Sequence, residues 1–398
     1  MAAKNQKNSK DVLTVNDIRH NNMVNIFTEI VSADGIRKND LAGRNNISLV
    51  TVNTIVNDLV KAGFAEERVC NTSVGRKPME IHVDSRYGSI VCINLSSVHE
   101  IRYIIYNLRG DTLRQNGLTF RIGAKDTLEE RIGVVLQEIG ECLRELCLKV
   151  AGVAAFIPGV YYEDTDEIRY ALYEELTGIR LHQILEDAFH VSNICILHDT
   201  FASAESEYES TRETHDSQFY LYCGDGVGSC FMTNGRPITG SELLAGEVGN
   251  CIMTAGKDSD LVRLEELISI QGILRKLPHE HRYREMEALI RMAEEGEEEI
   301  IKILSEAYWA VAVFISNIIW LYNPSKIVID SCCSEYADRI IEYTGRFFQE
   351  QFGDNMPTSV EIRKAKCDEF HTMKGCLRHV RKRWIEEVIS SLDTLHAE

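Results

Sequence analysis

At 398 residues the chain exceeds the usual size of one domain, so several hydrophobic cores are expected. Its 44% hydrophobic and 26% charged residues, with only six prolines, exclude extensive disorder. The apolar run 310–322 is too short to span a bilayer, and the polar, basic residues 1–10 have no apolar segment behind them. Neither a membrane segment nor a secretory signal is expected.

Charge is distributed unevenly along the chain. The net charge of −18 argues against nucleic acid as a partner, yet residues 1–86 carry 12 Lys and Arg against 10 Asp and Glu, while the remainder carries 31 against 51. Residues 1–86 are therefore predicted to form a separate domain from the acidic residues 87–398. The twelve cysteines include no CxxC pair, which in a long chain is typical of reduced thiols and predicts a cytoplasmic protein.

Residues 16–59 carry the pattern of three helices. Asn16 or Asp17 can cap a first helix that ends near residues 33–35. Its apolar positions follow a helical period and are Ile18, Met23, Ile26, Phe27 and Ile30. A short helix over 37–43, a turn at 44–47 and a third helix from Ser48 complete the spacing of a helix-turn-helix.

The third helix has two different faces. An apolar stripe is formed by Val52, Ile55, Val56 and Leu59. Short polar side chains on the other face can reach base edges, and the N-cap Ser48 can lie beside a phosphate. With two residues of the preceding turn, the candidate DNA contacts are Arg44, Asn45, Ser48, Thr51, Asn53 and Thr54. On periodicity alone, the solvated face of a three-helix bundle explains this pattern equally well.

A basic hairpin follows and favours DNA binding. Strands over 64–69 and 79–83 enclose residues 70–78, where Gly75 lets the backbone turn. Arg76 and Lys77 at the tip can enter a minor groove or contact phosphate. Such a tip is often only solvated, but that interpretation must also explain the helix pair.

This stretch resembles the winged-helix domain of the ROK family of repressors (repressor, open reading frame, kinase). The matching segments are Leu41-Ala42, residues 48–59 and Gly75-Arg76-Lys77-Pro78. The resemblance implies that the start of the third helix and the wing contact operator DNA. Leu49 stands where family members frequently carry a basic residue, so a different base preference is expected.

From residue 87 onward, strand and helix patterns occur in two sets. The expected strands are 89–94, 101–107, 112–121, 150–156, 219–223, 229–233 and 327–330, and the expected helices are 128–146 and 298–321. Two such lobes resemble the α/β, ribonuclease H-like fold of actin, hexokinase and sugar kinases. We expect lobes at roughly 87–198 and 199–380, with the C-terminal helix returning to the first lobe.

Four short segments extend the ROK resemblance over nearly the whole chain. They match the family's Pro-Gly turn, its Asn-Asp-Ala-Asn-x-Ala-Ala-x-Glu segment, its Gly-x-Gly-x-Gly phosphate loop and its Ala-Gly-Glu-x-Gly-His segment. In this sequence they lie at 157–160, 197–205, 223–228 and 244–249. Each match alone is weak, but their order and spacing together are specific.

Departures from the family pattern argue against kinase chemistry. A kinase of this fold needs an Asp-x-Gly-Gly-Thr hairpin, whose glycines let backbone N–H groups approach phosphates and whose Asp helps hold magnesium. Asn94, Ser96 and Ser97 occupy these positions here. Cys332 and Cys333 replace a second glycine cluster expected near adenosine, and we interpret them as small turn residues in preference to a redox pair. No catalytic residue and no cofactor are therefore expected.

The resemblance also implies a structural zinc, whose ligands this chain lacks. Asn250 stands at the position of the family's histidine, and residues 254–260 replace its cysteine-rich run. Cys251 alone is no substitute, so no metal is expected.

The sugar-facing positions are partly retained. Asp199 stands at the family's catalytic-base position, and Glu247 and Glu265 are also present. Carboxylates suit sugar hydroxyls because each can accept two hydrogen bonds. His198 replaces an asparagine and Asn250 a histidine, so a sugar of altered identity is expected at these five residues. The alternative is that they are remnants without a ligand.

These observations favour a DNA-binding transcriptional regulator, a repressor of carbohydrate-related genes. It would act on operator DNA as a homodimer or homotetramer and respond to a sugar or sugar-phosphate effector through lobe closure. The main rival is an active ROK-type sugar kinase with an accessory DNA-binding head, and a third possibility is a scaffold that senses a protein. The helical stretch expected at 277–299, rich in Glu and Arg, is interpreted as a solvated face in preference to an interface.

Overall fold

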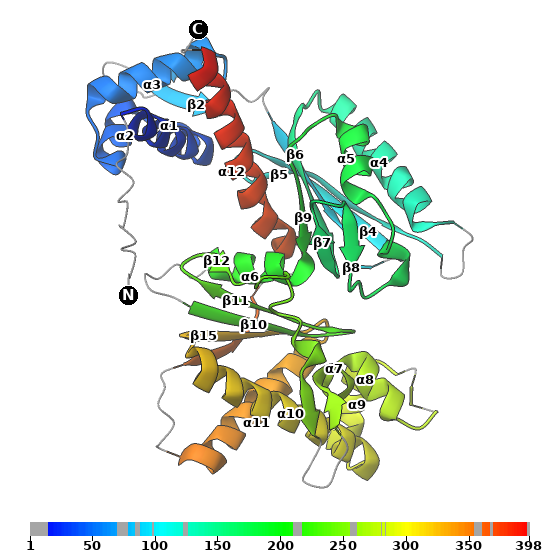
Figure 1. The fold of residues 1–398 in the computed structure, drawn as a ribbon. Coiled ribbons are helices and arrows are strands. Elements are labelled where there is room, and N and C mark those ends of the chain that lie inside the picture. Colours follow the sequence, from blue (N-terminus) through cyan, green and yellow to red (C-terminus); the bar gives the residue numbers. More distant parts are fainter. Residues whose placement is uncertain are drawn as a thin grey trace, which may run out of the picture.

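The computed structural model describes residues 15–69, 79–83, 88–97, 99–121, 126–209, 217–254, 261–279, 281–282, 284–353, 360–366 and 369–395. Figure 1 shows a small N-terminal head and two lobes, with the helix α12 running from the junction of the lobes to the head.

The head is a three-helix unit with a two-stranded antiparallel sheet. Its elements are α1 (Val15–Ser32), α2 (Lys38–Asn45), α3 (Leu49–Lys61), β1 (Ala65–Val69) and β2 (Met79–Val83). The Ser48 hydroxyl caps α3 by accepting a hydrogen bond from the Thr51 N–H at 3.1 Å. The apolar stripe expected on α3 is buried against α1, where four of the five expected apolar positions are buried as well.

Two details of the head differ from the expectation. α1 begins at Val15, so Asn16 and Asp17 lie inside its first turn and cannot be its N-cap, and Ile18 is exposed. α2 continues through Asn45, so the turn begins at Asn46, whose left-handed backbone (φ 54°) ends the helix.

The first lobe is a five-stranded sheet of order β5-β4-β3-β6-β9. Its strands are β3 (Ser89–Asn94), β4 (Glu100–Asn107), β5 (Thr112–Thr119), β6 (Val150–Ile157) and β9 (Ile194–His198). β3, β4 and β5 pair antiparallel, whereas β6 and β9 run parallel to β3. The apolar sides of α4 (Leu128–Glu145) and α5 (Leu181–Phe189) pack in the same core as these strands. A small hairpin of β7 (Val160–Tyr162) and β8 (Glu167–Arg169) follows β6.

The second lobe is a five-stranded sheet of order β12-β11-β10-β15-β16. Its strands are β10 (Ser217–Cys223), β11 (Val227–Thr233), β12 (Arg236–Pro237), β15 (Lys326–Asp330) and β16 (Glu361–Lys364). The remaining elements of this lobe are β13 (Ile252–Thr254), β14 (Leu261–Arg263), α7 (Leu264–Ile268), α8 (Ile270–Lys276), α9 (Met286–Glu294), α10 (Glu298–Tyr322) and α11 (Ser334–Phe352).

Two features of the second lobe concern its helices. The helix expected over 277–299 is interrupted, because α8 ends before Leu277 and α9 starts only at Met286. α10 is apolar and long enough to cross a membrane by length and composition, but the larger part of its apolar window is buried inside the lobe. α10 is therefore a core helix, because its apolar residues pack with those of β10, β15 and α11.

A pair of helices joins the lobes. α6 (Asp199–Glu209) lies on the second sheet, against β10 and β11, and α12 (Glu369–Leu395) lies on the first, against β3, β6 and β9. The two helices approach so closely at Gly375 that a Cβ there would collide with the Ala202 carbonyl oxygen. The Asn193 amide ties α12 to the first lobe by donating to the carbonyl oxygens of Val380 (2.9 Å) and Ala151 (3.1 Å).

The far half of α12 belongs to the core of the head. The Trp384 ring lies 5.4 Å from the Phe27 ring and 6.3 Å from the Phe64 ring, measured between centroids. An ion pair between Arg109 and Asp34 adds a polar contact between the first lobe and the head. A single hydrophobic cluster therefore extends from α1 through α12 to the first sheet.

Candidate ligand cleft and nucleic-acid interface

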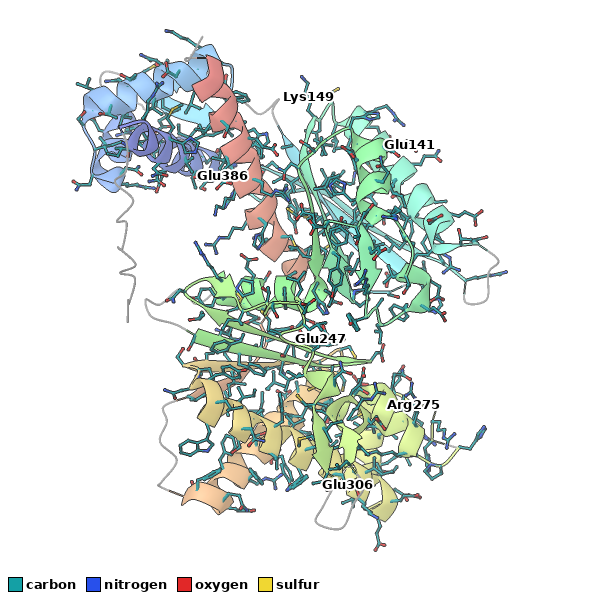
Figure 2. All side chains as sticks on the ribbon, in the orientation of Figure 1. Glu141, Lys149, Glu247, Arg275, Glu306 and Glu386 are labelled. Carbon is teal, nitrogen blue, oxygen red and sulfur yellow. The ribbon has the colours of Figure 1, made fainter. Side chains whose placement is uncertain are left out.

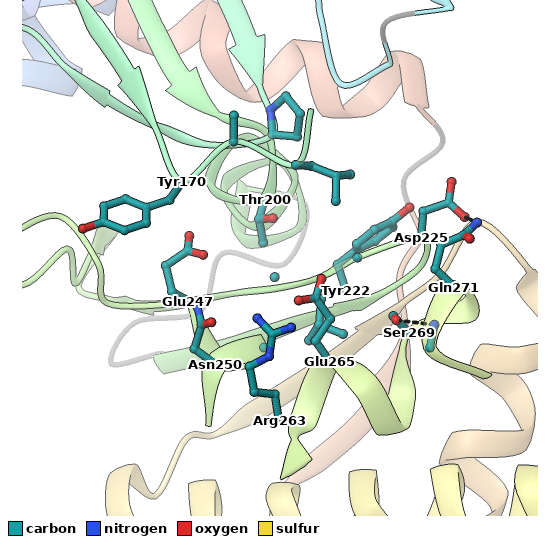
Figure 3. A pocket seen from close by; sticks show the side chains of 18 of the residues that line it. Tyr170, Thr200, Tyr222, Asp225, Glu247, Asn250, Arg263, Glu265, Ser269 and Gln271 are labelled. Atoms are coloured by element: carbon teal, nitrogen blue, oxygen red, sulfur yellow. Dashed lines mark hydrogen bonds between the residues drawn. The ribbon is translucent and has the colours of Figure 1, made fainter. Parts of the chain in front are cut away.

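A cleft of about 450 Å³ lies between the lobes. The label of Glu247 in Figure 2 shows where the cleft lies in the whole molecule, and Figure 3 shows the residues that line the cleft. The five residues proposed from the sequence to bind a ligand all line it, namely His198, Asp199, Glu247, Asn250 and Glu265. His198 ends β9 and Asp199 begins α6. Glu247 and Asn250 lie just before and in the short helical turn at 248–250, and Glu265 lies on α7.

His198 forms a bridge between two carboxylates. Its Nδ1 lies 3.1 Å from Asp199 Oδ1, and its Nε2 lies 3.3 Å from Glu247 Oε1. Burial opposes the imidazolium charge, but the hydrogen bonds and negative charges of Asp199 and Glu247 outweigh it and raise the pKa of His198 to about 10. The two carboxylates therefore favour the charged form of His198.

This bridge changes what Asp199 can do. Burial alone would raise the pKa of Asp199, but the hydrogen bond and charge of His198 hold that pKa below its ordinary value. The carboxylate also accepts hydrogen bonds from the Thr200 N–H at 2.7 Å and from the Ser96 side chain. A carboxylate with so many donors is a weak proton acceptor, so it suits binding a hydroxyl better than deprotonating one.

The bridge predicts a specific pH dependence of stability. Because folding raises the pKa of His198 from 6.5 to about 10, its contribution to stability is fully present below pH 6.5 and is lost as the pH rises to about 10. His198→Gln cannot titrate, so its free energy of unfolding should fall less over this range than that of the wild type. Urea denaturation at a series of pH values measures both curves. Parallel curves would show that His198 is not charged in the folded chain.

The residues that the sequence comparison with the family placed at nucleotide-binding positions make hydrogen bonds within the chain. Asn94 Oδ1 accepts a hydrogen bond from the Ser96 N–H at 2.8 Å, and Ser97 Oγ accepts one from the His99 N–H at 3.2 Å. Cys333 is the N-cap of α11, accepting from the Tyr336 N–H at 3.4 Å. Cys332 and Cys333 are both free thiols.

The glycine loop at 223–228 is a tight hairpin between β10 and β11. The Tyr222 ring packs over Gly224 so closely that a Cβ there would collide with the phenol oxygen. Asp225 lines the cleft and accepts a hydrogen bond from Gln271 at 3.2 Å. A carboxylate in this loop repels the phosphates that such loops bind in other proteins.

The zinc prediction concerns residues that are only partly described. Asn250 and Thr254 lie in the described part of the second lobe, whereas residues 255–260 do not. Among the described residues, no group of three or more His, Cys, Asp or Glu side chains is placed to hold a metal ion.

Sequence reasoning missed part of the cleft. Its lining also includes Tyr170, Leu172, Arg263, Gln271 and Arg275. Arg263 Nε pairs with Glu266 at 3.1 Å, and the Arg275 side chain is exposed. These residues belong to no motif, and only the packing of the two lobes brings them to one cavity.

The candidate DNA contacts among the described residues lie at the end of α2 and in the first half of α3. Ser48 Oγ and Thr51 Oγ1 lie 2.8 Å apart at the start of α3, Thr54 is exposed one turn further on, and Asn53 is half-buried. Arg44 and Asn45, however, are engaged within the head, Arg44 with Glu29 at 3.0 Å and Asn45 with the Leu41 carbonyl oxygen at 2.9 Å. Arg76 and Lys77 lie outside the described residues.

One exposed residue at the start of α3 was not singled out from the sequence. Val50 is 76% exposed, although its neighbour Val52 is fully buried. An exposed apolar side chain at the start of a groove-reading helix can contact the methyl group of thymine.

The chain is similar in sequence to known proteins of one family. It matches the ROK family over residues 91–383 and belongs to that family. It is 18% identical over 376 residues to the xylose repressor of Lactiplantibacillus pentosus, covering 90% of this chain and 92% of that protein.

Solved structures share its fold. A ROK family transcriptional regulator described as a homolog of the Escherichia coli MLC protein superimposes with a TM-score of 0.72 at 17% identity, over 93% of this chain and 97% of that one. The ROK hexokinase of Thermus thermophilus superimposes with a TM-score of 0.59 at 17% identity, over 73% and 96% of the two chains. The predicted two-lobed α/β fold and the family resemblance are confirmed.

Proposed function

We propose that this chain is a sequence-specific DNA-binding transcriptional regulator, a repressor of carbohydrate-related genes, controlled by a sugar or sugar derivative bound between its lobes. The observation that carries this proposal is a single hydrophobic core that joins a helix-turn-helix head to the first lobe, which lines the cleft. The similarity to proteins described as a xylose repressor and a ROK transcriptional regulator supports it.

The head is proposed to read a major groove with the start of α3. Ser48 and Thr51 stand at its N-terminus, where backbone N–H groups favour a phosphate, and Thr54 is exposed beyond them. Two copies of the chain, in a cytoplasmic homodimer or homotetramer, would place two heads on a two-fold operator.

A selection of duplexes from a random pool tests this role of the head. We expect enrichment of a defined sequence, whose affinity falls steeply with salt. Thr54→Ala should weaken binding to it by about tenfold and relax the preference at one base pair. Thr28→Ala is the matched control, because both hydroxyls are exposed in the head and donate to the carbonyl oxygen four residues earlier. Equal effects of the two substitutions, or no enrichment, would contradict the proposal.

The cleft and the head are connected through α6 and α12. α6 begins at Asp199 in the cleft, and its Glu205 contacts His379 of α12 at 2.5 Å. α12 then carries Trp384 into the core of the head. A ligand that moves the first turn of α6 would therefore reposition the head, provided that it binds the two arrangements with different affinity.

The close contact between α6 and α12 gives a testable prediction. Gly375→Ala should lower the free energy of unfolding by about 1–3 kcal/mol, because the added Cβ meets the backbone of Ala202, which cannot rotate away. Gly345→Ala is the control, since Gly345 also lies in a helix but a Cβ added there would have no atom within 4 Å; it should be neutral or stabilising. Thermal denaturation measures both, and an equal response would show that the contact is not tight.

The kinase alternative is tested by incubating the chain with ATP, magnesium and a panel of sugars. We expect no sugar phosphate, because Asp199 is engaged by His198 and a carboxylate, Asp225, stands in the glycine loop. Formation of sugar phosphate that Asp199→Ala abolishes would overturn the proposal in favour of a sugar kinase.

A further inference from the structure

Two segments of the first lobe give the cleft an apolar side. Pro158 follows β6, and Tyr170, Ala171 and Leu172 follow β8. Polar groups of the second lobe line the opposite side, namely Glu247, Asn250, Arg263 and Glu265. A cavity with one apolar and one polar side suits a ligand with apolar faces and hydroxyl-bearing edges, such as a sugar ring.

Tyr170 is held in an unusual position at one end of this cleft. Its φ is 54°, in the left-handed region that aromatic residues rarely adopt, and its side chain is 64% exposed. The segment is anchored just beyond it, where the Leu172 N–H donates to the Pro158 carbonyl oxygen at 2.8 Å. Backbone strain of this kind persists where the surrounding structure enforces it and is concentrated at functional sites.

The cleft has two ends, and Tyr170 lies at only one of them. Figure 3 shows Tyr170 on the side of Glu247 and Asn250, whereas Asp225 and Gln271 lie at the opposite end. The volume of about 450 Å³ falls within the range of about 300–1,000 Å³ typical of pockets for drug-sized ligands. A single hexose bound at Asp199 and Glu247 would leave much of this space to water.

We propose that Tyr170, at the end of the cleft beside Glu247, forms a second ring-binding subsite, so that the effector is a disaccharide or another glycoside carrying a second ring. This inference rests on the proposed control of the chain by a sugar. The first ring binds the carboxylates around His198, and the second packs a C–H face against the Tyr170 ring, which buries apolar surface of both.

The charges of the lining favour a neutral glycoside over a sugar phosphate. His198 stands against two carboxylates, Asp199 and Glu247, whereas Arg263 stands against one, Glu266. Asp225 and Glu265 add two more carboxylates, whereas Arg275 adds one positive charge, so the lining carries an excess of negative charge. A phosphate would be repelled in this setting, whereas hydroxyl groups find acceptors.

Two substitutions at one position test the subsite. Tyr170→Phe keeps the ring, whereas Tyr170→Asn removes the ring and keeps a residue that tolerates the left-handed backbone. The probes are free monosaccharides, their methyl glycosides, and the phenyl glycosides and disaccharides of the same sugars, measured by isothermal titration calorimetry. In the wild type and Tyr170→Phe, the two-ring ligands should bind about tenfold more tightly than the methyl glycosides, the size of one stacked ring. Tyr170→Asn should lose this difference while binding the monosaccharide unchanged.

The outcomes separate this inference from the proposed function. If the two-ring ligands bind no better than the monosaccharides, or if Tyr170→Asn retains the difference, the second subsite is overturned and control by a sugar still stands. If no saccharide of any length binds, both the second subsite and the sugar effector are overturned, and DNA binding stands or falls on the duplex selection.

Discussion

Replacing Trp384 with alanine is expected to lower the free energy of unfolding by about 3–5 kcal/mol. The indole is 8% exposed and packs against Phe27 and Phe64 in the cluster that joins the head to the first lobe. Truncation would leave a cavity lined by aromatic rings, which a rigid helix such as α12 cannot fill. Urea denaturation followed by far-UV circular dichroism measures the loss.

Trp320→Ala provides the matched control, because Trp320 is 58% exposed at the end of α10. Its loss should change stability by less than about 1 kcal/mol. The Trp384 variant should also separate the two proposed functions, DNA binding and its control by a ligand, since a head that is no longer held by α12 would respond less to a ligand in the cleft. Equal destabilisation by the two substitutions would contradict the assignment of Trp384 to the core between head and lobe.

Replacing Arg363 with methionine is expected to cost about 3–5 kcal/mol, although methionine fills much of the same space. Arg363 of β16 donates to Glu207 Oε2 at 2.5 Å, and the Glu207 carboxylate on α6 is fully buried. Without the guanidinium, the buried Glu207 carboxylate still accepts from the Lys366 N–H, at 2.5 Å, but loses the positive charge of Arg363. The midpoint of thermal unfolding reports the loss.

Arg346→Met is the corresponding surface change. Arg346 pairs with Glu342 one turn away on the exposed side of α11, at 3.8 Å, and such pairs contribute about 0.5 kcal/mol or less. Restoration of stability in Arg363→Met by the further substitution Glu207→Gln, which removes the stranded charge, would establish the cause. A loss no larger than that of Arg346→Met would refute the importance of the buried pair.

The parts of the fold that local sequence determines were predictable. Ser48 caps α3 because a short hydroxyl side chain reaches the N–H three residues later, and the stripe of α3 is buried because its spacing is helical. The start of α1 was not predictable from capping preference, since the helix begins before Asn16. α6 was not expected either, because its helix depends on packing against α12 and the second sheet.

The same distinction applies to the site. The family motifs locate the five residues around His198, but they do not predict that His198 bridges two carboxylates, one of them far away along the chain at Glu247. Arg44 and Asn45 were expected in a turn, whereas α2 extends through both, and each makes a hydrogen bond within the head. Tyr170 carried no pattern at all, because a left-handed backbone at a tyrosine is imposed by its surroundings.

Occupancy of the cleft is proposed to set the affinity of the head for DNA. The fluorescence anisotropy of the selected duplex, titrated with the chain in the absence and presence of a saturating glycoside, measures this coupling. We expect the ligand to change the Kd for DNA by at least about fivefold. Glu247→Gln, which alters the cleft, should reduce this change, and Thr28→Ala, which lies in the head, should leave it intact. An unchanged Kd with the cleft saturated would show that the cleft does not control the head.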